Sequence, residues 1–209
     1  PQEIRFYHAK PVITASKTTD TVYSKPSPTR AEVSDVANSV IDHTDAVMLS
    51  AESATGKYPV RAVQMMSKIT GDPEESSYDD LSPLEKEPIS YCLAVSCIAA
   101  DLAKKIKVDG IIVTTLSGFT AQTVSKYRPE LPIVALVSHE RIKRQMNLSW
   151  GVVPLVIPRF ENIETLLKKS INDVKKRKIF KQGDRIIIVS GHPTGKSGFT
   201  NLIKIFDMP

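Results

Sequence analysis

Residues 28–59, PTRAEVSDVANSVIDHTDAVMLSAESATGKYP, decide how the first part of the chain folds. Thr29 and Glu32 have capping-box spacing, in which a hydroxyl and a carboxylate three residues apart bind each other's backbone amides, so a helix is predicted to begin here. The apolar residues that follow recur at helical spacing and predict one stripe that packs on a sheet: Val33, Val36, Ala37, Val40 and Ile41. The short apolar run 46–49 then predicts a strand covered on both faces, and Pro59 suits the start of a second helix.

Residues 10–16, KPVITAS, predict an earlier strand, because β-branched residues form its centre and polar residues bound it. The resulting order of strand, helix, strand and helix indicates parallel strands with right-handed crossovers. Ligands of such folds lie beyond the carboxyl ends of the strands, which places Ser16 at one strand end and Ser50 with Glu52 at the next. On pattern alone, the alternative that these are ordinary polar residues at strand ends stays open.

The segment 71–88 contains three prolines and seven acidic residues, which predicts a linker between a first domain, 1–70, and a second domain, 89–209. The second domain carries 19 basic and 9 acidic residues, so an anionic partner is expected there. Its alternating pattern predicts a small α/β domain with a mostly parallel sheet and an antiparallel last strand. The predicted strands are 110–115, 132–137, 152–157, 185–190 and 202–206, and the predicted helices are 89–103, a segment from 119 onward, 139–148 and 162–178.

The segment 114–120, TTLSGFT, places hydroxyl groups and a glycine between a predicted strand and a predicted helix. Backbone amides at a helix N-terminus, together with Ser and Thr hydroxyls, are suited to bind phosphate, although a polar turn with an ordinary N-cap is an equally common interpretation. The segment 191–201, GHPTGKSGFTN, does not fit a P-loop, because only three residues separate Gly191 from Gly195 and a strand-like run follows.

The segments 28–38, PTRAEVSDVAN, and 45–63, DAVMLSAESATGKYPVRAV, closely resemble pyruvate kinase, and 197–201, SGFTN, matches a loop of the same family. The resemblance implies a partial (β/α)8 barrel segment followed by the family's C-terminal α/β regulatory domain. It also implies transfer of phosphate from phosphoenolpyruvate to ADP, giving pyruvate and ATP in glycolysis. Ser16 stands where the family has a threonine in the phosphoenolpyruvate site, so the resemblance makes it the catalytic candidate and makes Ser16, Ser50 and Glu52 substrate-binding candidates.

In allosteric members of the family, a loop that corresponds to 114–120 holds a phosphate of a sugar-phosphate effector. The resemblance therefore implies an effector site made by Thr115, Ser117, Gly118, Thr120, Lys196, Ser197 and Gly198. Leu116 and Phe119 replace basic residues that many effector-responsive members have, and Thr55 replaces a lysine often associated with nucleotide phosphates. The identity of an effector is left open.

The resemblance implies Mg²⁺ and K⁺ in the complete enzyme, but the catalytic lysine and the ARGDLG-like metal-binding segment of the family do not occur in these 209 residues. The chain is therefore expected to be the last part of a longer enzyme and to be inactive alone, with no metal site of its own. The family is usually a homo-tetramer, which makes Arg30 and Glu32 candidates for contacts between barrels. Salt bridges within one subunit are the alternative.

Other classes of function receive less support from the sequence. The basic run 175–178, KKRK, lacks interleaved aromatic residues, which favours a solvated helix face over a nucleic-acid partner. No run approaches ~18 apolar residues, so no membrane partner is expected. Cys92 and Cys97 fit reduced core thiols, which agrees with an intracellular protein. A cytoplasmic location is expected, with an organellar one as the alternative. A stand-alone regulatory or sugar-phosphate-binding protein derived from the C-terminal domain is the second hypothesis, and a basic nucleic-acid-binding domain is the third.

Overall fold

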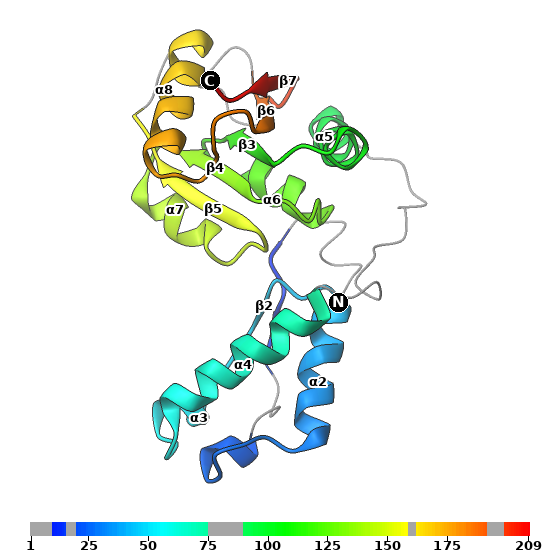
Figure 1. Ribbon diagram of the computed structural model, residues 1–209, viewed down its shortest axis with the longest axis vertical. Helices are drawn as coiled ribbons and strands as arrows, with labels where there is room; N and C mark the ends of the chain where they lie inside the picture. Colours follow the sequence, from blue (N-terminus) through cyan, green and yellow to red (C-terminus); the bar gives the residue numbers. More distant parts are fainter. Residues whose placement is uncertain (1–9, 16–19, 75–89, 159–161, 192–198) are drawn as a thin grey trace. The chain divides into compact units, whose positions relative to one another are not determined.

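The computed structural model describes residues 10–15, 20–74, 90–158, 162–191 and 199–209. The chain divides into two compact units, residues 1–82 and 83–209, and Figure 1 shows the elements of each. In the described part of the chain, no helix is both long enough and apolar enough to cross a membrane.

The described residues of the first unit form two short parallel strands with helices between and after them (Figure 1). Strand β1 pairs with β2 through Ile13 opposite Ala46 and Thr14 opposite Val47, which confirms the predicted parallel order. The elements are β1 (Ile13–Thr14), the 3₁₀ helix η1 (Asp20–Tyr23), α2 (Arg30–Ile41), β2 (Ala46–Val47), α3 (Ala51–Ala54) and α4 (Pro59–Glu74).

Both strands of this unit are shorter than predicted. Ala46 and Val47 are half-buried and Met48 is 44% exposed, so the prediction that 46–49 is covered on both faces was wrong for this chain. A strand is covered on both faces only where other elements pack against each face. The two-stranded sheet described in this unit is too small to provide that cover.

Helix α2 begins as the capping box predicts. Thr29 Oγ1 accepts a hydrogen bond from the Glu32 amide at 3.3 Å, and Glu32 Oε2 accepts one from the Thr29 amide at 2.6 Å. The buried side of the helix carries Val36, which packs with Met66 and Ile69 of α4. The predicted stripe therefore forms the small core of this unit.

Helix α4 begins at Pro59 as predicted but continues to Glu74, four residues past the predicted end of the first domain. Pro73 lies one turn after Ile69 and is buried like it, so the apolar side of the helix extends into the acidic segment. The rest of the predicted linker falls within residues 75–89, which lie outside the described residues.

The second unit is an α/β domain around a five-stranded sheet, which confirms the predicted fold class (Figure 1). The strand order is β5-β4-β3-β6-β7, parallel except that β7 runs antiparallel to β6. The elements are α5 (Tyr91–Ile106), β3 (Gly110–Thr114), α6 (Phe119–Lys126), β4 (Ile133–Val137), α7 (Glu140–Met146), β5 (Val152–Val156), α8 (Ile163–Lys176), β6 (Arg185–Ser190) and β7 (Leu202–Asp207).

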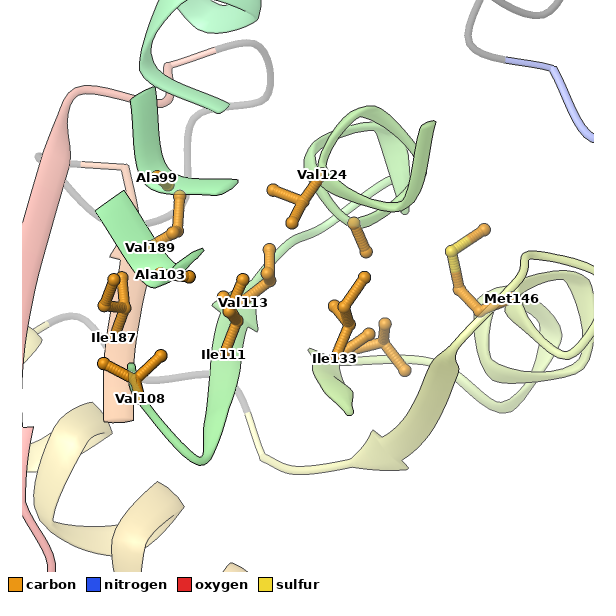
Figure 2. Packing of buried hydrophobic residues seen from close by; sticks show 13 residues of the cluster. Ala99, Ala103, Val108, Ile111, Val113, Val124, Ile133, Met146, Ile187 and Val189 are labelled. Atoms are coloured by element: carbon orange, nitrogen blue, oxygen red, sulfur yellow. The ribbon is translucent and has the colours of Figure 1, made fainter. Parts of the chain in front are cut away.

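Each face of this sheet has its own apolar core. Figure 2 shows the first, in which Ile111 and Val189 of the strands lie with Ala99 of α5 and Val124 of α6. On the opposite face, Ile112 and its neighbours pack with the side chains of α8. Because successive side chains of a strand point to opposite faces, adjacent residues of β3 serve different cores. The sheet is thus buried on both sides, as parallel sheets generally are.

Candidate functional site

The strand order of the second unit defines where a ligand would enter. From β3 the chain proceeds to β4 and β5 on one side, and β6 then lies on the other side of β3. The reversal of direction between β3 and β6 is a topological switch point, and open α/β sheets bind ligands in the crevice outside the carboxyl ends of the strands at such a point. The turn from Thr114 to Phe119 follows β3 at this end, and residue 191 begins the segment that follows β6.

Gly118 shapes the turn after β3. Its φ is +89°, a left-handed conformation that glycine adopts without strain, and its amide donates to Thr115 Oγ1 at 3.0 Å. A Cβ at this position would lie 2.5 Å from Met146 Cε, so the space is also restricted. The turn is held by local contacts that favour glycine at residue 118.

The N-terminus of α6 has no strong side-chain cap. Gly118 itself occupies the N-cap position, and the Phe119 amide donates to Ser117 Oγ at a long 3.4 Å. A helix N-terminus carries partial positive charge on amides that point outward. The alternative interpretation of 114–120, a polar turn with an ordinary N-cap, therefore does not fit α6, because no side chain caps this helix. The exposed Ser117 lies beside the first amides of α6.

Two pairs of hydroxyl groups connect this turn to the segments around β6. Thr114 Oγ1 lies 2.6 Å from Ser190 Oγ, and Thr120 Oγ1 lies 2.8 Å from Thr200 Oγ1. The structure thus brings Thr115, Ser117, Gly118 and Thr120 together in one turn, and it adds Thr200, which the sequence prediction missed. Lys196, Ser197 and Gly198 lie outside the described residues.

Aromatic side chains also lie near the turn. Phe119, at the first position of α6, and Phe199, beside Thr200, both expose large rings to solvent. Phe199 lies against Tyr91 of α5, with ring centroids 6.4 Å apart. The sequence analysis named Phe119, whereas the contact of Phe199 with Tyr91 depends on tertiary structure and could not be predicted from the pattern.

In the first unit, Ser16 lies outside the described residues, whereas Ser50 and Glu52 follow β2. Glu52 is only 4% exposed, and its Oε2 accepts a 2.9 Å hydrogen bond from the Ser50 amide. Ser50 is exposed and its side chain makes no capping bond to α3. Glu52 thus stabilises the turn that presents Ser50, while contact of either residue with substrate stays a prediction.

The two residues predicted at a barrel contact differ in their surroundings. Arg30 is exposed, whereas Glu32 is 8% exposed and its carboxylate accepts bonds from the Thr21 amide, the Thr29 amide and the Thr29 hydroxyl. Burial raises the pKa of Glu32, but these hydrogen bonds together lower it, and the net pKa lies below its ordinary value of 4.5. Within the chain, Glu32 therefore joins η1 to α2.

Two family models match the chain in the order of its two units. The model described as "Pyruvate kinase, barrel domain" matches residues 5–63, and the model described as "Pyruvate kinase, alpha/beta domain" matches residues 93–206, more than half of the chain. The fold and the matches define a protein in which part of a β/α barrel precedes a doubly wound α/β domain. The chain belongs to the pyruvate kinase family.

Curated relatives agree with this assignment. The chain is 39% identical over 201 residues to the pyruvate kinase of Clostridium acetobutylicum, and the match covers 94% of this chain and 42% of that protein. It is 41% identical over 199 residues to the pyruvate kinase of Geobacillus stearothermophilus, and this match covers 94% of this chain and 34% of the relative. The chain therefore spans about 34–42% of the length of these relatives.

Proposed function

We propose that this chain works as part of a pyruvate kinase, which transfers a phosphoryl group from phosphoenolpyruvate to ADP and yields pyruvate and ATP in glycolysis. The observation that carries the proposal is the ordered match of both units to the two domains of that family, over residues 5–63 and 93–206. The proposal includes a homo-tetramer in the cytoplasm, with Arg30 and Glu32 near a contact between barrels.

The first unit contributes one rim of the active site. Ser16 supplies a hydroxyl that positions or protonates the enolate, and Glu52 holds the turn that presents Ser50. Phosphoryl transfer also needs cations that neutralise the phosphates. Among the described residues there is no group of three or more His, Cys, Asp or Glu side chains that could hold a metal ion. We assign the Mg²⁺ and K⁺ of the family to the part of the enzyme that carries its ARGDLG-like segment.

The second unit binds a sugar phosphate as a regulatory ligand. The phosphate lies at the N-terminus of α6, where backbone amides and the Ser117 hydroxyl bind it, and Lys196 adds positive charge. Three features support this placement: the switch point between β3 and β6, the N-cap position of Gly118 without a side-chain cap, and the net charge of +10 over residues 89–209.

A coupled assay tests the proposed activity. The protein purified from its natural source should form pyruvate when both phosphoenolpyruvate and ADP are present, and its intact mass should be measured on the same sample. The 209-residue chain alone should give no turnover, because the family's catalytic lysine and ARGDLG-like segment do not occur in it. Turnover by the purified 209-residue chain, with contaminating enzyme excluded, would contradict this division of roles.

One observation favours the second hypothesis, a stand-alone binding protein. Residues 83–209 form a compact unit with an apolar core on each face of the sheet, so this unit has the packing that independent folding requires. A natural protein that begins near Pro1, binds sugar phosphate and forms no pyruvate would support this alternative over the enzyme.

A further inference from the structure

Two hydroxyl pairs join the same two stretches of chain at the switch point. Thr114, the last residue of β3, pairs with Ser190, the last residue of β6. Thr120, in the first turn of α6, pairs with Thr200, which lies shortly before β7. Thr114 and Ser190 are 76 residues apart in sequence, and Thr120 and Thr200 are 80 residues apart, so only the tertiary structure brings each pair together.

The backbone pairing of β3 with β6 ends just before these connections. The register of the two strands extends to Val113 opposite Val189, and beyond that point they are joined through the hydroxyls of Thr114 and Ser190. Thr120 is 8% exposed and Thr200 is 2% exposed. A buried hydroxyl without a partner costs free energy, so the Thr120–Thr200 bond offsets the burial of both hydroxyls.

This contact changes the role expected for Thr120. The resemblance implied that its hydroxyl binds the effector, but in the structure this hydroxyl is buried and bonded to Thr200. From its place in the first turn of α6, Thr120 instead fixes the amides on which the proposed phosphate site depends. A site whose donors are held in place before binding loses less entropy when the ligand arrives.

We infer that Thr120 and Thr200 are a pair of positioning residues that hold the N-terminus of α6 in its phosphate-binding geometry. The inference rests on the proposed sugar-phosphate site of the second unit. It separates residues that contact the ligand, such as Ser117, from residues that act through the placement of α6. The bond also links the turn after β3 to the chain that leads into β7.

Calorimetric titration of the 209-residue chain with fructose 1,6-bisphosphate, and separately with inorganic phosphate, tests the inference. The double variant Thr120→Val/Thr200→Val replaces both hydroxyls by methyl groups of similar shape, so no buried hydroxyl is left unpaired. It should bind about three- to tenfold more weakly than the wild type, the equivalent of one lost hydrogen bond, with an unchanged circular-dichroism spectrum. Thr200→Ser, which keeps the hydroxyl, should retain wild-type affinity.

The first unit offers a matched control, because Thr14 Oγ1 donates to Thr44 Oγ1 at 2.9 Å in another pair of threonines. Thr14→Val should leave the affinity for the phosphate probes unchanged. Wild-type affinity in the double variant, or equal loss in Thr200→Ser, would overturn the positioning role while leaving the proposed site intact. Absence of heat with the wild-type chain would overturn the proposed site and this inference with it.

Discussion

Glu32 Oε1 accepts a 2.7 Å hydrogen bond from the backbone amide of Thr21, while Oε2 of the same carboxylate caps α2 through Thr29. One side chain therefore stabilises two elements, η1 and α2. Glu32→Ala should lower the free energy of unfolding by about 1–3 kcal/mol, because it removes the charged acceptor of the partly buried hydrogen bonds from the Thr21 and Thr29 amides. Urea denaturation measures this loss, and Asp35→Ala, an exposed carboxylate on the same helix, is the matched control.

The same carboxylate predicts a dependence of stability on pH. Because the folded pKa of Glu32 lies below its ordinary value of 4.5, the ionised form stabilises the fold. This contribution is fully present above the unfolded pKa and is lost as the pH falls through the lower folded pKa. The difference in unfolding free energy between the wild type and Glu32→Gln should thus be constant near neutral pH and shrink below about pH 4.5. A difference that grows on acidification would contradict the hydrogen-bond assignment.

Gly118 and Gly71 should respond in opposite ways to alanine. Gly118 has a φ of +89° and restricted space beside Met146, so Gly118→Ala should cost about 1–3 kcal/mol and should weaken phosphate binding. Gly71 lies within α4, where an added Cβ would meet open space, so Gly71→Ala should stabilise by about 0.5–1 kcal/mol. Thermal unfolding of both variants checks the contrast, and equal effects would refute the account of the turn.

Local sequence signals predicted much of the fold. The capping box marked the start of α2, and the apolar run 185–190 has the same bounds as β6. The start of a helix and the bounds of a buried strand depend on residues close together in sequence, so both can be predicted from the sequence pattern. The end of α4 was missed because a proline in an acidic segment indicates a linker, whereas Pro73 lies on the buried side of the helix.

The candidate site was predicted only in part, because its geometry depends on tertiary structure. The hydroxyls of 114–120 indicated a turn suited to bind phosphate. The strand order that places β6 beside β3 could not be predicted from the sequence pattern. Without that order, Thr200 could not be paired with Thr120, and the hydroxyl of Thr120 was assigned to the ligand. The family resemblance is the basis of the proposed function, and the Thr120–Thr200 bond is the basis of the positioning role that we infer.

The most direct test of the account is calorimetric titration of the 209-residue chain with a series of sugar phosphates, comparing the wild type with the double variant Ser117→Ala/Lys196→Ala. Saturable heat is expected with the wild type and should disappear in the double variant, since the exposed hydroxyl beside the α6 amides and the cation proposed to join it are both removed. Unchanged binding in the double variant would contradict the assignment of the phosphate site to the turn after β3.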